Sequence, residues 1–191
     1  MKYTCKKVSN ACGALAKIRH SASFDLLREI YYALFYSYVR YGISIWGNAT
    51  QTVLDPIRIL NHRAARIMTF APFGRIDMNP ILNYLEILDI DDIFLLETAK
   101  LIYKIKTSMI PIALGQYFEL RNVNHTHNYN LRPRNNRVET IITRTQSGEK
   151  SLQYRGPIVW NVIPENIRDC TTFVTFKKQL KMHLLLLQSI E

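Results

Sequence analysis

The chain has 191 residues, of which 48% are hydrophobic, so it can form one domain or two small ones around a buried core. Its 25 Lys and Arg against 15 Asp and Glu give a net charge of +10, which favours an anionic partner such as nucleic acid. With seven Gly and seven Pro, the composition excludes a disordered chain.

Capping residues and apolar spacing indicate the first helices. Ser9 can cap a helix over residues 10–20, and Ser23 can cap the next one. The second helix repeats apolar residues at helical spacing, namely Leu27, Ile30, Tyr31, Leu34 and Tyr38. Gly42 and Gly47 then bracket a tight segment that presents Trp46, for which we expect a core position.

The next predicted helix, from about Thr52 to Ala71, has an apolar and a basic face. Pro72 and Gly74 end it. Its apolar face comprises Ile57, Leu60, Ala64, Ile67 and Met68, and its basic face comprises Arg58, His62 and Arg66. Because guanidinium groups bind phosphate in a forked geometry, this face, with Arg63 beside it, is a candidate phosphate-contact surface. An ordinary solvated helix face explains the pattern equally well.

An acidic segment, residues 81–97, follows and contains no base. Asn79-Pro80 predicts a short helix that ends near Leu85, and Asp89 is placed to cap a long helix that extends to about Thr107. One class of two-metal enzyme, the polymerases, holds its ions with an Asp doublet on a β-hairpin, so the doublet Asp91-Asp92 has to be considered. Here the doublet stands at a helix start, where the helix dipole accounts for it, so we predict neither a catalytic role nor a metal.

Helical periodicity is lost over residues 119–150, after a short helix predicted from Pro111 to Phe118. Residues 138–144 alternate weakly, which predicts one or two short strands, and Ser147-Gly148 predicts a turn. Residues 151–161 are expected to be helical or turn-like around a core Trp160. Thr172 is placed to cap a final helix with an apolar stripe of Phe173, Phe176, Leu180, Leu184 and Leu187.

Together these elements predict a mainly α fold with two regions. Residues 1–118 form a helical bundle, and residues 119–191 form a tail with an irregular, partly β segment, a basic loop and a final helix. The basic loop and its flanks form a second candidate surface for RNA or DNA, because loop side chains are free to reach a partner. This cluster comprises Arg132, Arg134, Arg137, Arg144 and Arg155.

No motif for a cofactor, a metal or a nucleophile occurs in the sequence, so we expect none. Cys5, Cys12 and Cys170 lack the spacing of a zinc site, and with an amino terminus that has no apolar run they indicate an intracellular protein, of nucleus or cytoplasm, rather than a secreted one. The longest apolar stretch, residues 31–46, contains Arg40 and polar-edged side chains, so we expect no membrane span.

Four motifs occur in a distinctive order between Val8 and Leu187. They are Tyr41-Gly42-x-x-x-Trp46-Gly47, Arg63-Ala64-Ala65-Arg66-Ile67-Met68, Gly156-Pro157-x-x-Trp160-Asn161-x-x-Pro164 and Phe176-Lys177-Lys178-x-Leu180-Lys181. In this order and spacing they resemble the carboxy-terminal thumb and tail of reverse transcriptases from LINE-type (non-LTR) retrotransposons, of the jockey or CR1 kind.

The resemblance implies the non-catalytic end of an RNA-directed DNA polymerase. In that family the helical thumb grips the template–primer duplex, which implies phosphate contacts for Arg58, Arg63 and Arg66. The fingers and palm would precede Met1, and the catalytic aspartates have no counterpart, so we expect no enzyme activity from the chain on its own. The missing palm would be the native packing partner, and candidates for the surface it leaves uncovered are Tyr31, Tyr32, Phe35 and Tyr36.

Two functional hypotheses remain open. The first is sequence-independent binding of RNA or DNA, such as a template–primer-like duplex, through phosphates. The second is a folded protein-interaction module, or an inert remnant, with no nucleic-acid role. In that case the acidic residues 86–97 could engage a basic patch on another copy of the chain.

Overall fold

The computed structural model describes residues 2–72, 74, 76–111, 138, 140 and 142–189. The chain is mainly α-helical, as predicted, and no strand occurs in the part of the chain that is described. It forms two compact units, residues 1–94 with 183–191 and residues 95–182. The first unit takes in the end of the last helix, and the regions expected at residues 1–118 and 119–191 remain a prediction.

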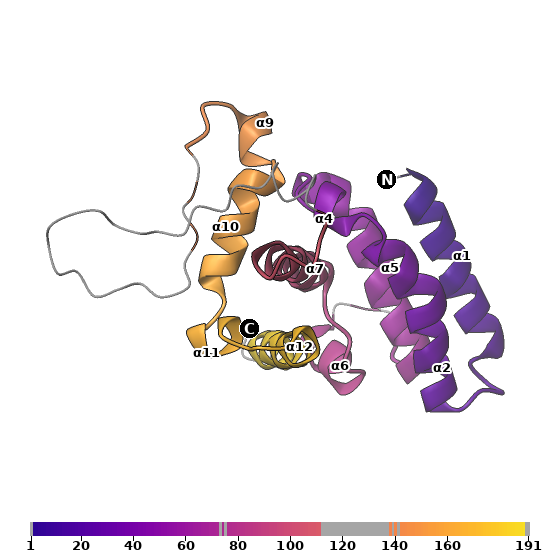
Figure 1. The fold of residues 1–191 in the computed structure, drawn as a ribbon. Coiled ribbons are helices and arrows are strands. Elements are labelled where there is room, and N and C mark those ends of the chain that lie inside the picture. Colours follow the sequence, from indigo (N-terminus) through magenta and orange to yellow (C-terminus); the bar gives the residue numbers. More distant parts are fainter. Residues whose placement is uncertain are drawn as a thin grey trace, which may run out of the picture. The chain divides into compact units, whose positions relative to one another are not determined.

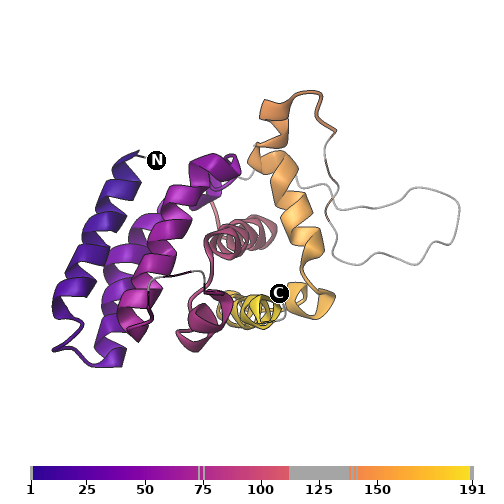
Figure 2. The same ribbon diagram turned by 180° about the vertical axis from the view of Figure 1, so that it is seen from behind.

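Three helical rods build most of the first unit (Figures 1 and 2). The first is α1 (Lys2–Ile18), and the third is α5 (Gln51–Thr69). The second is continuous and consists of α2 (Phe24–Ile30), the π-helical segment η1 (Tyr31–Tyr36) and α3 (Ser37–Arg40). In both views α1, α2 and α5 lie side by side, and α1 packs on both η1 and α5.

The start of α1 differs from the prediction. The helix begins at Lys2 rather than near residue 10, and Ser9 lies exposed within it instead of capping it. Val8, Cys12 and Leu15 are fully buried and recur at helical spacing, so the core-facing stripe starts before Ser9. Burial of this stripe outweighs the capping preference of a serine side chain.

The π-helical segment explains which side chains of the second rod enter the core. Leu27, Tyr31, Phe35 and Val39 are buried at a regular spacing of four residues. A π turn contains more residues than an α turn, so inserting η1 keeps this spacing on one side of the rod. The prediction that Tyr31 and Phe35 lie on an uncovered surface is therefore wrong.

The opposite side of the same rod is correspondingly solvent-facing. Leu34 is 41% exposed and Tyr38 is 39% exposed, although helical spacing placed both in the apolar face. Tyr32 and Tyr36 are half-buried. The rod thus leaves a different set of aromatic and apolar side chains exposed from the set that the sequence indicated.

A buried amide links the second rod to α5 and to the segment that precedes α7 (Ile90–Lys106). The Tyr31 hydroxyl donates to Asn61 Oδ1 at 2.8 Å, and Asn61 Nδ2 donates to the carbonyl of Leu88 at 3.2 Å. Tyr31 and Asn61 are both fully buried. Each hydrogen bond therefore satisfies polar groups that have no access to water.

Several predicted boundaries are confirmed. Ser23 caps α2, with its hydroxyl accepting from the Leu26 amide at 3.4 Å. The segment between the two glycines is α4 (Ile43–Trp46), and Gly42 takes a left-handed conformation with φ 90°. The short helix α6 covers Asn79–Tyr84, and α7 begins directly after Asp89. Trp46, for which a core position was expected, is only half-buried.

The carboxy-terminal residues close the first unit. Gln188, at the end of α12 (Phe173–Gln188), is 4% exposed. Its Oε1 accepts from the Asp89 amide at 3.1 Å, and its Nε2 donates to the carbonyl of Ile87 at 3.3 Å. Leu187, predicted in the apolar stripe, is 44% exposed, so the polar Gln188 occupies the buried position instead.

An aromatic core holds the second unit together. It comprises residues 95–106 of α7, α9 (Gln146–Glu149), α10 (Leu152–Val162), α11 (Glu165–Arg168) and residues 173–182 of α12. Tyr103 stacks on Phe176 with ring centroids 4.5 Å apart, and Trp160 stacks on Phe176 at 5.7 Å. Trp160 is 1% exposed, which confirms its predicted core position.

Other predictions for this unit need correction. Val138 forms an isolated bridge, with its amide and carbonyl both bonded to the side chain of Asn161 at 3.0 and 2.8 Å, and residues 139 and 141 of the segment expected to form short strands lie outside the described residues. The expected turn at residues 147–148 is the helical turn α9, which Thr145 caps. The helix predicted after Pro111 and most of the irregular segment lie outside the described residues.

Candidate nucleic-acid interface

Two acid-free stretches of the first unit lie against each other. Residues 1–24 carry five Lys or Arg and residues 56–76 carry four, and neither stretch contains Asp or Glu. The first stretch includes α1 and the second includes most of α5, and these helices pack together. The Cys12 thiol donates to the carbonyl of Leu60 at 3.5 Å across this contact. Folding therefore brings the cations of α1 beside those of α5, and of these Arg58 is paired with the carboxylates of Asp55, Asp89 and Asp91.

Arg63 and Arg66 are the predicted site residues on this acid-free surface. Arg63 is exposed. Burial raises the pKa of Cys12, on α1, to about 11, and the positive charge of Arg63 partly offsets that rise. Arg66 is half-buried, and its Nη2 donates to the carbonyl of Gly74 at 3.0 Å. Arg63 is thus accessible to a phosphate, and Arg66 is oriented by the backbone that follows α5.

Arg58 differs from these two because it is bound to acids of the protein itself. Its guanidinium contacts Asp55 Oδ1 at 2.7 Å and Asp91 Oδ2 at 2.8 Å. Its Nε lies 3.5 Å from Asp89 Oδ2, and its Nη2 donates to Gln51 Oε1 at 2.7 Å. The side chain is only 21% exposed. Arg58 is therefore not the free, solvent-facing cation that the helical spacing predicts.

His62 belongs to the same internal network. Its Nε2 is 3.5 Å from Asp89 Oδ1, which is longer than a well-formed hydrogen bond. Burial alone would raise the pKa of Asp89, but the imidazole of His62, the amide of Ile90 and the guanidinium of Arg58 outweigh burial and lower it. Asp89 is therefore held as a carboxylate that joins the start of α7 to α5.

The Asp91-Asp92 doublet lies in the first turn of α7, as predicted. Acids at this position are stabilised by the positive end of the helix dipole, and Asp91 also pairs with Arg58. Among the described residues, no group of three His, Cys, Asp or Glu side chains could hold a metal ion. The geometry of the doublet thus matches a helix start that is joined to α5 by an ion pair.

The second predicted cluster is only partly described. Arg132, Arg134 and Arg137 lie outside the described residues. Arg144 lies in a bend before α9, and Arg155 lies in α10, and both are exposed in the second unit. Their side chains are accessible to a partner.

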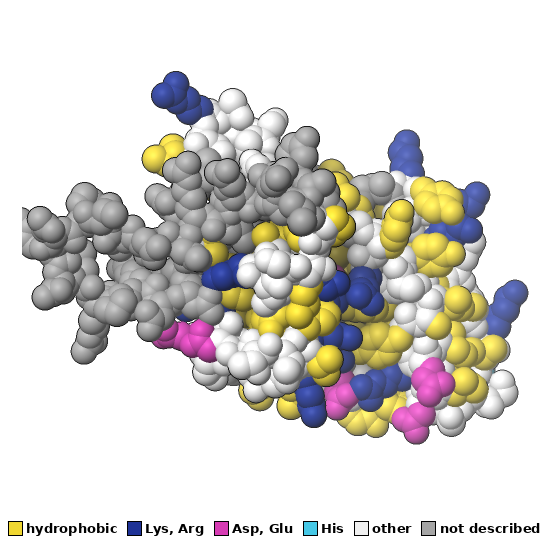
Figure 3. Space-filling view, in the orientation of Figure 1, with side chains coloured by type: hydrophobic (Ala, Val, Ile, Leu, Met, Phe, Trp, Pro, Cys, Tyr) yellow, Lys and Arg dark blue, Asp and Glu magenta, His cyan; other side chains and the backbone are white. Residues whose placement is uncertain are grey.

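The sequence-based site omitted the lysines of α1. Lys2 and Lys6 are exposed, and the ammonium of Lys7 lies 5.5 Å from the ring centroid of Tyr3 and 5.9 Å from that of Tyr38. In Figure 3, Lys and Arg side chains stand between hydrophobic ones on the side of the first unit where α1 lies. The signal that could have found them is the lack of any acid before Asp25.

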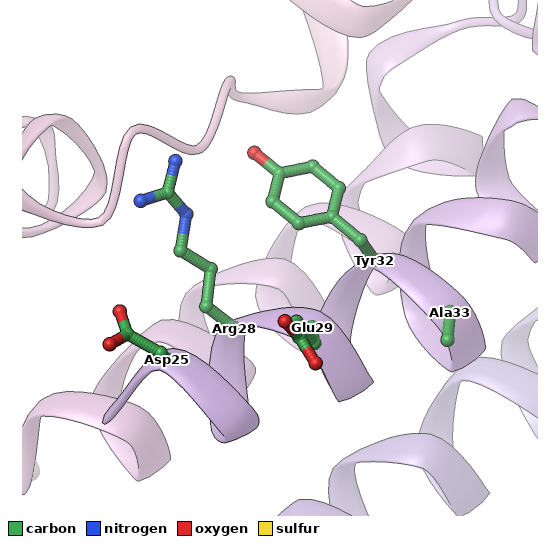
Figure 4. A pocket seen from close by; sticks show the side chains of 5 residues that line it. All are labelled: Asp25, Arg28, Glu29, Tyr32 and Ala33. Atoms are coloured by element: carbon green, nitrogen blue, oxygen red, sulfur yellow. The ribbon is translucent and has the colours of Figure 1, made fainter. Parts of the chain in front are cut away.

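A shallow recess of about 690 Å³ lies along α2 and η1, lined by Asp25, Arg28, Glu29, Tyr32 and Ala33 (Figure 4). Arg28 and Tyr32 extend to the same side, and both contact Glu86. Arg28 forms an ion pair with its carboxylate, and the Tyr32 hydroxyl donates to its carbonyl at 2.9 Å. Because the arginine is already paired and two further acids flank it, this recess does not suit a phosphate.

Comparison with protein-family models, with curated proteins and with solved structures yields no match for this chain. Within the described ranges, no helix is both long enough and apolar enough to span a bilayer. The candidate interface is therefore supported by geometry alone. It is the surface formed by α1 and by residues 59–69 of α5 (the α1–α5 surface).

Proposed function

We propose that this chain binds duplex RNA or DNA through its phosphate backbone, without reading base sequence. The observation that supports the proposal is the packing of α1, which has no acid, against α5, whose residues 56–69 have none. Lys and Arg contacts to phosphate supply affinity and position but carry no sequence information. The net charge of +10 strengthens long-range attraction of such a polyanion.

The contact set that we propose is centred on Arg63 and Arg66, with Arg19 and Lys17 near the end of α1. The guanidinium of Arg19 lies over the ring of Phe70, 4.3 Å from its centroid, so this cation is held close to the end of α5. Arg58 and His62 are left out of the set, because carboxylates of the protein already contact both side chains. A phosphate would have to displace Asp89 and Asp91 to reach Arg58.

The test is a salt titration of binding. A fluorescent duplex of about 16 base pairs is titrated with the protein at several salt concentrations, and affinity is read by anisotropy. Contact with three or four phosphates predicts a slope of log affinity against log salt of roughly −2 to −4. Replacing Arg63 and Arg66 by Gln should reduce that slope by about 2 and leave the melting temperature nearly unchanged.

A matched control is Lys177→Gln, which removes one exposed cation from α12 in the second unit. Its affinity and salt slope should stay close to those of the wild type. A slope near zero for the wild type would exclude the proposed function. Equal losses in the control and in the double Arg variant would mean that the duplex responds to net charge and not to the α1–α5 surface.

We also propose that the chain corresponds to the thumb and tail of a LINE-type reverse transcriptase, without polymerase activity of its own. The order of the four motifs supports this, together with the helical position of Asp91-Asp92, which differs from the β-hairpin that a two-metal site of this class requires. Primer extension with Mg²⁺ or Mn²⁺ tests it. Activity that disappears in Asp91→Asn would contradict the proposal.

The alternative of self-association through the acidic residues 86–97 is weakened by the ion pairs. Asp89 and Asp91 are bound to Arg58, and Glu86 is bound to Arg28. These carboxylates have less charge to offer a basic patch on another copy. Sedimentation analysis at low and high salt tests the alternative, because a salt-sensitive dimer would revive it.

A further inference from the structure

Two exposed tyrosines and a lysine come together at the amino-terminal end of α1. Tyr3 and Lys7 lie one turn apart on α1, and Tyr38 lies on α3. The Lys7 ammonium is 5.5 Å from the ring centroid of Tyr3 and 5.9 Å from that of Tyr38, so it joins the two rings. Tyr3 is 69% exposed and Tyr38 is 39% exposed. We call these three residues the tyrosine platform.

The surroundings of the tyrosine platform are cationic. Lys2 and Lys6 are exposed on the same helix. Residues 1–24 and residues 30–54, which supply all of α1 and α3, contain no Asp or Glu. Beyond the platform, Tyr41 is 88% exposed at the end of α3. The tyrosine platform thus presents aromatic rings next to several lysines, with no acid on either helix. Such a surface is complementary to an anion that carries flat rings.

We propose that the tyrosine platform binds unpaired nucleotides of single-stranded RNA or DNA. Bases stack on the rings of Tyr3 and Tyr38, and Lys2, Lys6 and Lys7 lie beside the phosphates that connect them. Aromatic side chains within a basic surface are the usual means of holding single strands without sequence preference. The inference rests on the proposed function for the class of partner, but it assigns a separate site. The tyrosine platform lies at the start of α1, whereas Arg63 neighbours Cys12 in the middle of α1.

A lipid surface is the less suitable occupant. A helix that lies in a membrane interface needs a broad apolar face for the lipid. The apolar face of α1, which comprises Val8, Ala11, Cys12 and Leu15, is already buried in the first unit. What remains outside consists of hydroxyl-bearing rings with an ammonium close to them, which suits bases and phosphates better than acyl chains.

The experiment compares single-stranded with duplex binding. Fluorescent oligothymidine and oligouridine of about 12 nucleotides, and a duplex of about 16 base pairs, are titrated with the full chain. Tyr3→Leu and Tyr38→Leu should each weaken single-strand binding by about 5-fold to 100-fold, the range that loss of one stacked base produces. Duplex affinity should stay within about twofold. Tyr3→Phe and Tyr38→Phe keep the ring and should bind like the wild type.

The matched control is Tyr84→Leu, because Tyr84 is 70% exposed, almost the same as Tyr3, but lies on α6. Its single-strand affinity should not change. A second readout does not depend on the Leu variants: irradiation of a 5-iodouracil oligonucleotide with the wild-type chain should attach it at Tyr3 or Tyr38, as mapped by mass spectrometry.

The outcomes separate this inference from the proposed function. If both Leu variants bind single strands like the wild type, or if attachment maps elsewhere, the tyrosine platform is excluded while duplex binding through Arg63 stands. Equal losses on single strand and duplex would also overturn base stacking. If the wild type binds neither nucleic acid, both proposals fail. Tyrosine-dependent binding to anionic phospholipid vesicles or to polyglutamate, without binding to oligonucleotides, would reassign the surface.

Discussion

The buried hydrogen bonds of Asn61 allow a quantitative test of the packing in the first unit. Asn61 accepts from the Tyr31 hydroxyl and donates to the Leu88 carbonyl, out of reach of water. Tyr31→Phe leaves one buried polar group without a partner, and Asn61→Leu leaves two. The double variant leaves only the Leu88 carbonyl. The cost of each unpaired group is about 1 to 3 kcal/mol.

With about 1.5 kcal/mol for each group, the free energy of unfolding should fall by about 1.5 kcal/mol in Tyr31→Phe and by about 3 kcal/mol in Asn61→Leu. The double variant should lose only about 1.5 kcal/mol, which gives a coupling energy of about 3 kcal/mol. That value is at the upper end of the range for residues in contact, because one partner's removal leaves the other buried and unpaired.

Urea unfolding followed by circular dichroism measures all four chains of this cycle. Tyr32→Phe is the control. The Tyr32 hydroxyl also donates to a carbonyl, that of Glu86 at 2.9 Å, but this hydrogen bond is exposed, so water can replace it. The cost of Tyr32→Phe should stay below about 1 kcal/mol. If the losses of the two single variants simply add in the double variant, the reasoning that the two side chains share one buried hydrogen bond is refuted.

Three further predictions concern stability. The pKa of Asp89 is lowered in the folded chain, so its charge stabilises the fold above about pH 4 and this contribution is lost as the pH falls through the lowered value. Asp89→Asn should therefore lose less stability than the wild type between neutral and strongly acidic pH; equal losses in urea midpoints would contradict this. Gly47→Ala should destabilise by about 1 to 3 kcal/mol, because its methyl group would lie 2.5 Å from the Ile43 carbonyl oxygen and from the Phe94 ring. Gly13→Ala meets nothing within 4 Å and should stabilise α1 by about 0.5 to 1 kcal/mol. Thermal melts that reverse the order of the two glycine variants would disprove the packing argument.

Helix boundaries were predictable where local chemistry determines them. Ser23 and Asp89 precede helices whose first amides need an acceptor or a negative charge, and the structure starts α2 and α7 directly after them. Ser9 carries the same local signal, but burial of Val8 extends the helix through it. Local signals thus predict a helix start unless an apolar stripe continues across it.

The π-helical segment could not be read from residue spacing. A four-residue repeat such as Leu27, Tyr31, Phe35 and Val39 is compatible with an α-helix whose apolar stripe drifts slowly around it. Only packing against α1 and α5 determines that all four side chains face one way. The choice between Tyr31 and Tyr38 as core residues therefore depended on tertiary contacts.

The candidate site was predictable in its cations but not in their partners. Spacing along α5 placed Arg58, His62 and Arg66 on one side of the helix, and all three side chains are half-buried there. It could not show that Asp89 and Asp91, about 30 positions later, would fold onto Arg58 and His62. For the same reason, the cations of α1 became relevant only once α1 and α5 were seen to be neighbours.

The position of Gln188 in the sequence determines when the first unit can be completed during synthesis. Its side chain completes the backbone pairing at Ile87 and Asp89, but the ribosome adds it 99 residues after Asp89. Until then the amide of Asp89 and the carbonyl of Ile87 must be satisfied by water, and the nascent amino-terminal bundle stays unfinished while residues 95–182 emerge. Completion of the first unit therefore requires that residues 95–182 have been synthesised before the segment that contains Gln188 can join it.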